Sequence, residues 1–98
     1  MPIPRALTIN GWDIVSDAAG AIVVEVSKDT YANFPPDFST DQISGTEDPT
    51  LVATNQKNQD ISFSSFSGAI SKGDVMGFNV LSVTTVKWVA ITFRCTYP

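Results

Sequence analysis

Carboxylates are the side chains in this sequence that could carry acid–base chemistry in any number. The 98 residues contain no histidine and a single cysteine, Cys95. A Ser-His-Asp or Cys-His catalytic arrangement and a Cys/His zinc site are therefore excluded. Asp13 and Asp17 lie four residues apart, but a glycosidase needs two carboxylates that flank a cleft at a set separation. We interpret both as solvated residues near a turn, and we expect no enzymatic activity.

A second group of acids lies in a long polar segment of the chain. Asp37, Asp41, Glu47 and Asp48 offer the oxygen ligands that Ca²⁺ prefers, but their spacing lacks the alternating order of an EF-hand loop. Cys95 has no base near it in the sequence, and we expect it to be a small buried residue on the inner face of a strand. We therefore expect neither a metal site nor another cofactor.

Aromatic side chains are the better candidates for binding, because they stack on sugars and anchor protein contacts. The candidates are Trp12, Tyr31, Phe34, Trp88 and Tyr97, together with Arg94, which shares the expected strand face of Trp88. Tyr31 and Phe34 come just before two prolines, where an aromatic side chain is easily exposed. The alternative that most of these aromatic residues belong to the core or its edge stays open.

The charge balance restricts the partners of the chain. Six Lys and Arg residues stand against ten Asp and Glu, which gives a formal net charge of −4. Nucleic-acid binding depends on neutralising phosphates, so we expect no nucleic-acid partner. We also expect no membrane association, because the sequence shows no long apolar run. We expect the chain to be made in a reducing cytoplasm, because it shows no signal-peptide pattern at its start. Charged residues make up only 16% of the chain, which suits a protein that is partly covered in an assembly.

Alternating apolar and polar residues predict strands along most of the chain, and helical spacing is nearly absent. The expected strands cover residues 5–16, 21–27, 61–66, 75–83 and 85–97. In the clearest of them Ile22, Val24 and Val26 should point inward. The turn at residues 17–20 suits a hairpin in which Gly20 takes a positive φ.

The two faces of the last expected strand differ in polarity. One face carries Val89, Ile91, Phe93, Cys95 and Tyr97. The other carries Trp88, Ala90, Thr92 and Arg94 and is only half polar, so we expect another strand or a neighbouring chain to cover it. Residues 37–60 form a long segment that we expect to be irregular or to lie along an edge, and that is a candidate contact region. Together these features predict one all-β domain over residues 1–98, an antiparallel β-sandwich or jelly roll of six to eight strands.

One run of residues is distinctive enough to suggest a family. Residues 28–36 read KDTYANFPP and follow Gly11-Trp12 and an aliphatic strand at residues 20–26. Matching segments follow at residues 48–51, 55–59, 73–80 and 83–86. This arrangement resembles a β-sandwich module of tailed-bacteriophage structural proteins, of the fibre, tail or capsid-decoration type. The chain begins almost at the start of the module, which favours a small accessory protein over a fibre.

The resemblance implies a non-enzymatic protein of the virion. We expect a homo-oligomer, a trimer, that is made in the host bacterial cytoplasm and then decorates or cements the capsid by contacting other virion proteins such as the major capsid protein. The alternative is a tail-fibre or receptor-binding module that recognises a host-surface glycan through Tyr31, Phe34 and Trp12.

Overall fold

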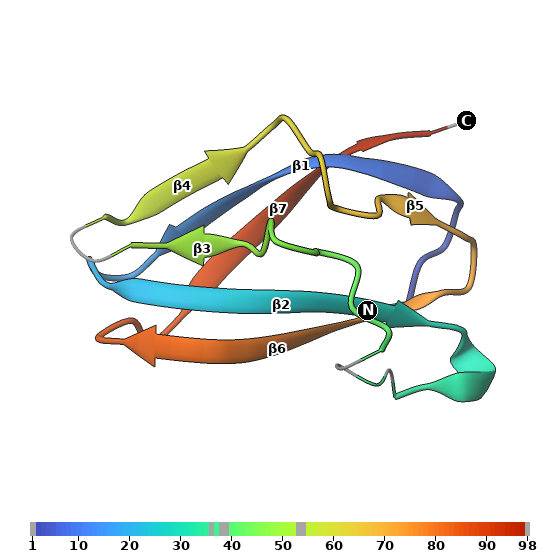
Figure 1. Ribbon diagram of the computed structural model, residues 1–98, viewed down its shortest axis with the longest axis horizontal. Coiled ribbons are helices and arrows are strands. Elements are labelled where there is room, and N and C mark those ends of the chain that lie inside the picture. Colours follow the sequence, from blue (N-terminus) through green and yellow to red (C-terminus); the bar gives the residue numbers. More distant parts are fainter. Residues whose placement is uncertain (1, 36, 38–39, 53–54, 98) are drawn as a thin grey trace.

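The computed structural model describes residues 2–35, 37, 40–52 and 55–97, and these form an antiparallel β-sandwich (Figure 1). The predicted all-β fold is therefore confirmed. The strands are β1 (Leu7–Ser16), β2 (Ala21–Asp29), β3 (Thr50–Leu51), β4 (Lys57–Asp60), β5 (Ala69–Ile70), β6 (Val75–Thr84) and β7 (Val89–Thr96). A single 3₁₀ turn, η1 (Tyr31–Asn33), follows β2.

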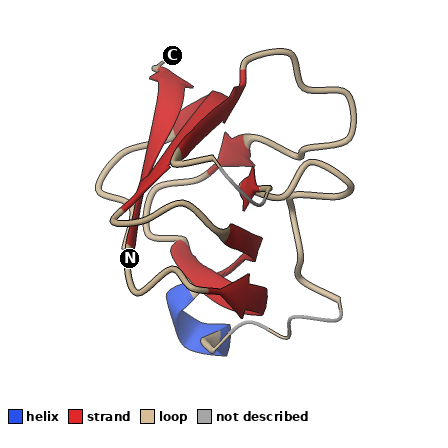
Figure 2. Cartoon of the chain, turned by 90° about the vertical axis from the view of Figure 1, so that its left-hand side faces the viewer, coloured by secondary structure: helices blue, strands red, loops and turns tan. Residues whose placement is uncertain are grey.

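The strands form two sheets, which Figure 2 shows as two layers seen from one end of the molecule. In the first sheet β7 runs along one side of β1, while β4 and β5 pair in succession along its other side. In the second sheet β2 is central, with β3 on one side and β6 on the other. The two central strands supply most of the core.

Alternation within β2 places its side chains as the sequence predicts. Ile22, Val24 and Val26 are buried. In β1 a β-bulge interrupts the pairing with β7 between Ile9 and Gly11. Ile9 and Trp12 are both buried although they are three positions apart, which simple alternation does not allow. The core consists of Ile3, Ile9, Trp12, Ile14, Ile22, Val24, Val26, Ile43, Leu51, Phe66, Ile70 and Met76.

The hairpin predicted at residues 17–20 is wrong. This turn carries the chain from β1 in one sheet to β2 in the other, because each strand must present its apolar face to the same core from opposite sides. Gly20 is not among the described residues with a positive φ. A Cβ atom at Gly20 would lie 2.4 Å from the carbonyl oxygen of Thr84, so glycine is required there by the close approach of two chain segments.

The strand predicted at residues 61–66 is also wrong. The regular pairing is made by the preceding residues of β4, which are polar and line up with residues 12–15 of β1. Within the loop that follows, the rings of Phe63 and Phe66 stack with their centroids 4.3 Å apart. The two phenylalanines pack against the core from a loop, although their alternation with serine resembles the pattern of a strand.

Part of residues 37–60, the segment that was expected to be irregular or to lie along an edge, lies along β2 as an interrupted edge strand. The N–H of Ile43 donates to the carbonyl of Val26 (2.8 Å), and the N–H of Val24 donates to the carbonyl of Pro49 (2.9 Å). Residues 44–48 leave the sheet between these two points. Within the described residues, β3 and β4 are the regular strands of this segment, and residues 38–39 and 53–54 lie outside the description.

Glu47 connects this departing loop to both sheets. Its Oε1 atom accepts hydrogen bonds from the backbone N–H groups of Ser64 (2.8 Å), Ser65 (2.5 Å) and Phe66 (2.9 Å). Its own carbonyl accepts a hydrogen bond from Nε1 of Trp12 (2.8 Å). The backbone N–H of Ser65, followed by those of Ser64 and Phe66, outweighs desolvation and lowers the pKa of Glu47 from 4.5 to about 2.

The three N–H contacts make the stability of the fold depend on pH through Glu47. Since the pKa is lower in the folded state, the stabilisation is complete above pH 4.5 and is lost as the pH falls towards about 2. Glu47→Gln should therefore unfold at lower urea concentration than the parent at pH 7, with a difference that shrinks between pH 4.5 and 2. Glu25→Gln, on the outer face of β2, controls for the change in net charge. A difference in stability between the parent and Glu47→Gln that stays constant over the whole pH range would contradict this role of Glu47.

Candidate interaction surface

Trp12 is not available for a surface contact. Its side chain is 3% exposed, and it packs in the core between the two sheets. The bulge next to Asn10 turns it inward, and the Glu47 carbonyl satisfies its indole N–H. Of the two interpretations of this residue, the core interpretation is correct.

Tyr31 and Phe34 lie at the tip that follows β2. Tyr31 is 81% exposed and Phe34 is also exposed, as predicted for aromatic residues just before the prolines. The 3₁₀ turn is closed by a hydrogen bond from the Phe34 N–H to the Tyr31 carbonyl (3.4 Å). The second proline, Pro36, lies outside the described residues. The turn that carries these two exposed aromatic residues follows β2 and forms a small tip at one end of the sandwich (Figure 1).

Trp88 and Arg94 lie on the outer side of β7. Trp88 is 58% exposed, and no strand in the described chain covers this face, so the expectation that another strand covers it is wrong, and cover by a neighbouring chain stays a prediction. The guanidinium of Arg94 pairs with Asp13 through two contacts, Nε to Oδ2 (3.1 Å) and Nη2 to Oδ1 (3.2 Å). This pairing holds Arg94 flat against the sheet.

Asp17 has a structural role at the turn end of the sandwich. Its Oδ1 atom accepts hydrogen bonds from the N–H groups of Lys87 (3.0 Å) and Trp88 (3.3 Å). The Lys87 contact is the main reason that the pKa of Asp17 is lowered. Asp17 therefore ties one crossing between the sheets to the other, while Asp13 is paired with Arg94.

The prediction that Cys95 is buried is wrong. The residue is exposed near the end of β7. It pairs with Ile9 and so faces the same way as the core residues, but it lies where the opposite sheet no longer covers that face. Partial desolvation raises the pKa of its thiol. A raised pKa leaves less thiolate at neutral pH, which is the reverse of what a nucleophile needs.

The sandwich is closed along one long side and open along the other. On the closed side, Nδ2 of Asn58 in β4 donates to the carbonyl of Thr50 in β3 (2.8 Å). On the other side, β6 and β7 are the edge strands of their sheets within the described chain. Only Phe78 and Phe93 form a ring contact there, with centroids 6.1 Å apart.

A hollow of about 260 Å³ opens between the two edge strands, lined by Phe78, Val89, Ile91 and Phe93. Further along β6, Val80, Leu81 and Val83 are exposed. Val80 and Val83 pair with Val24 and Ile22, whose side chains are buried, so they face the interior and yet reach solvent. These seven apolar residues of β6 and β7 are called the open side below.

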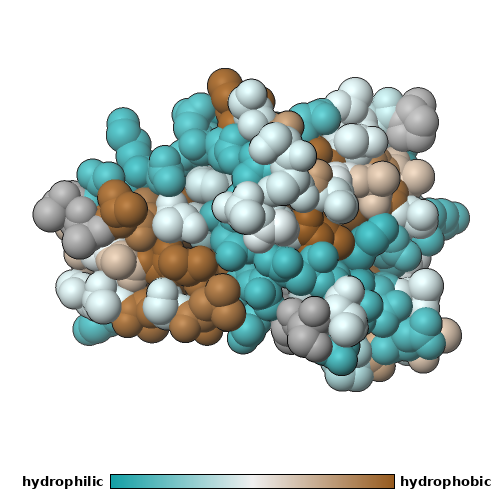
Figure 3. All heavy atoms as spheres, in the orientation of Figure 1, coloured by the Kyte–Doolittle hydropathy of each residue, from teal (hydrophilic) through white to brown (hydrophobic). Residues whose placement is uncertain are grey.

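Figure 3 shows apolar side chains gathered at the lower left of the molecule, where Figure 1 places the end of β6. Phe78 and Val80 pair with the buried residues Val26 and Val24 and point inward with them, but the interior that they point into is incomplete. The sequence does carry a signal for this surface. Residues 75–86 contain no charged residue, although β6 is an edge strand.

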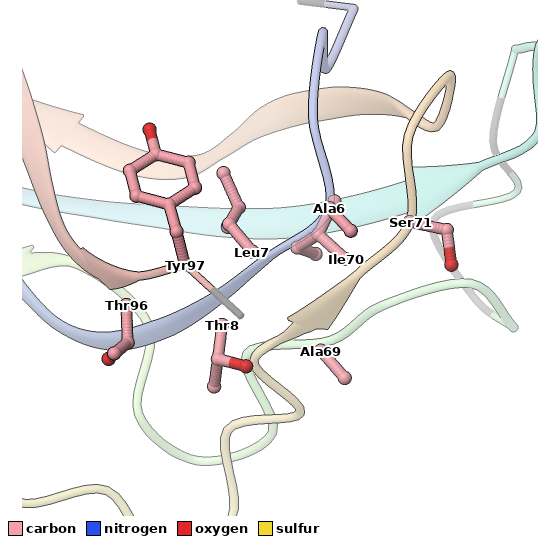
Figure 4. A pocket seen from close by; sticks show the side chains of 8 residues that line it. All are labelled: Ala6, Leu7, Thr8, Ala69, Ile70, Ser71, Thr96 and Tyr97. Atoms are coloured by element: carbon pink, nitrogen blue, oxygen red, sulfur yellow. The ribbon is translucent and has the colours of Figure 1, made fainter.

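A second hollow, of about 300 Å³, lies between the start of β1, β5 and the end of β7. Its lining consists of Ala6, Leu7, Thr8, Ala69, Ile70, Ser71, Thr96 and Tyr97. Figure 4 shows that the side chains of Tyr97 and Leu7 point away from those of Thr8 and Thr96. The polar groups of this hollow therefore do not converge on one position, as a ligand site would require.

Among the described residues, no group of three or more cysteine or acidic side chains is arranged to hold a metal ion. No helix in the described part of the chain is long and apolar enough to cross a membrane. Comparisons with protein-family models, with curated proteins and with solved structures found no match. Functional inference therefore rests on the geometry above and on the sequence motifs.

The different environments of the two tryptophans predict different fluorescence. Trp88→Phe should leave an emission from Trp12 that is shifted to the blue and resists quenching by acrylamide, because the remaining indole is buried. Trp12→Phe should leave the quenchable emission of Trp88 and should destabilise the fold by about 1 kcal/mol, since the hydrogen bond to Glu47 is lost. Equal quenching of the two variants in their folded states would contradict the placement of these residues.

Proposed function

We propose that this chain is a non-enzymatic structural protein of a tailed-bacteriophage virion, which assembles as a homotrimer and decorates or cements the capsid. The observation that carries the proposal is the open side, where the interior of the sandwich stays uncovered. Large apolar surface at solvent marks an interaction site. The motif at residues 28–36 supports the phage assignment.

The use of the acidic residues supports a structural role. Asp13 pairs with Arg94, Asp17 holds the turn at residues 87–88, and Glu47 holds the loop at residues 64–66. The backbone N–H contacts lower the pKa of Asp17 and of Glu47 and so favour the ionised form of these two carboxylates. Asp13, Asp17 and Glu47 therefore make contacts that stabilise the fold.

The distribution of exposed residues suggests two separate contacts in the particle. The open side runs along β6 and β7 and suits contacts between copies, whereas the turn that carries Tyr31 and Phe34 lies at one end of the sandwich (Figure 1). We assign that tip to contact with another virion protein, such as the major capsid protein. A low proportion of charged residues favours both contacts, since fewer charges lose their hydration.

The virion assignment predicts that the protein is present in purified particles. Particles of the source phage, purified on a density gradient, should contain the chain by mass spectrometry, and cryo-electron microscopy should show it as trimers on the capsid lattice. Density at a tail or fibre tip would instead favour receptor binding. A chain found only in the soluble lysate, and never in particles, would overturn the proposal.

The exposure of Tyr31 favours one alternative, a receptor-binding module that recognises a host-surface glycan. In this case the protein should bind on a glycan array, and Tyr31→Ala should abolish the binding. Tyr97→Ala is the matched control, because Tyr97 is also exposed but packs against Arg5 elsewhere on the molecule. Silence of the parent protein across a broad array would contradict this alternative.

A further inference from the structure

We infer that the open side seats a second copy of this chain, whose own open side meets it so that the edges of β6 and β7 pair with strand edges of the neighbour. The inference rests on the proposed function only in that both require self-assembly. It goes further by naming the strands and residues that make the contact. The argument depends on the two edges, on their spacing and on their charge.

The two free edges are the first part of the argument. Beyond the isolated bridge between Pro2 and Val75, no strand in the described chain pairs with the outer edge of β6, and none pairs with that of β7. The backbone groups along such an edge are available for hydrogen bonds with another strand. A partner that adds strands there also covers Val80 and Val83, which face the incomplete interior.

The spacing of these edges identifies the shape of the partner. β6 and β7 belong to different sheets, and packed sheets lie about 10 Å apart. A single extended segment would pair with one edge and leave the other uncovered. A second copy brings an edge of each kind, so β6 of one chain can pair with β7 of the next, and in a trimer the three open sides meet at one axis and join their apolar interiors.

The charge of the surface favours a contact between identical chains. Copies with a net charge of −4 repel each other weakly, and identical surfaces place like charges near one another. The β6 part of the open side avoids this cost because residues 75–86 carry no charge, and in β7 the charge of Arg94 is paired with Asp13. The bulge between Val23 and Val24 of β2 leaves Leu81 as an extra residue in β6, so the irregularity adds apolar surface instead of a protecting charge.

The test compares two valines of similar exposure. Val80 in β6 is 52% exposed, and Val52, which follows β3 on the closed side, is 57% exposed. Sedimentation equilibrium and native mass spectrometry at micromolar concentration should show assembly of the parent protein. Val80→Glu should raise the dissociation constant at least about tenfold, because an unpaired carboxylate would be buried in the contact. Val52→Glu should assemble as the parent does.

Folding of the variants is checked separately. Val80→Glu and a second variant, Val83→Glu, should both keep the circular dichroism spectrum of the parent, since the two positions are exposed in the single chain. Wild-type protein that stays monomeric, or folded Val80→Glu and Val83→Glu proteins that assemble as well as the parent, would overturn the inference.

The outcomes for this interface and for the proposed function are distinct. Assembly that is lost in Val80→Glu, together with absence of the chain from particles, would support the interface and contradict the virion role. Trimers in particles that Val80→Glu leaves intact would support the virion role and contradict this interface. A stable dimer that Val80→Glu dissociates would support the interface and contradict the trimer.

Discussion

The contact on which the rest of this sandwich depends is made by Glu47. One residue in a loop receives three backbone N–H groups of a second loop on its carboxylate and the indole N–H of Trp12 on its carbonyl. The loops on both sides of the contact have almost no regular pairing of their own. Without this contact the segment at residues 44–48 would leave the indole N–H of Trp12 buried and unpaired, which is costly in a core.

The two long sides of the sandwich differ because the strands along one side are short and those along the other are long. β3, β4 and β5 are short, but loops tied by Glu47 fill the space beside them. β6 and β7 are long and have no such loop beside them in the described chain. The interior is thus completed by irregular chain along one side and left unfinished along the other, where assembly is proposed.

The local features of the fold could be predicted from the sequence, and the long-range features could not. Alternation of Ile22, Val24 and Val26 is a property of neighbouring residues, and it gave the correct strand and inward face. The burial of Trp12 depends on a bulge, and the path of the turn at residues 17–20 depends on which sheet the next strand joins. The prediction that Cys95 is buried failed for a similar reason, because the exposure of this residue is set by where the opposite sheet ends. Exposure of Tyr31 was predictable because the two prolines that follow it cannot donate to a strand ladder, so the chain leaves the sheet there.

The uncharged edge of β6 also bears on how the protein is produced. An exposed strand with valines, a leucine and no charge is the kind of segment that templates open-ended aggregation while a chain is still folding. Assembly around a closed axis removes this hazard because every edge is used and growth stops. The proportion of fibres to discrete particles should therefore depend on how quickly closure follows synthesis, and a charge introduced at this edge would improve solubility at the expense of assembly.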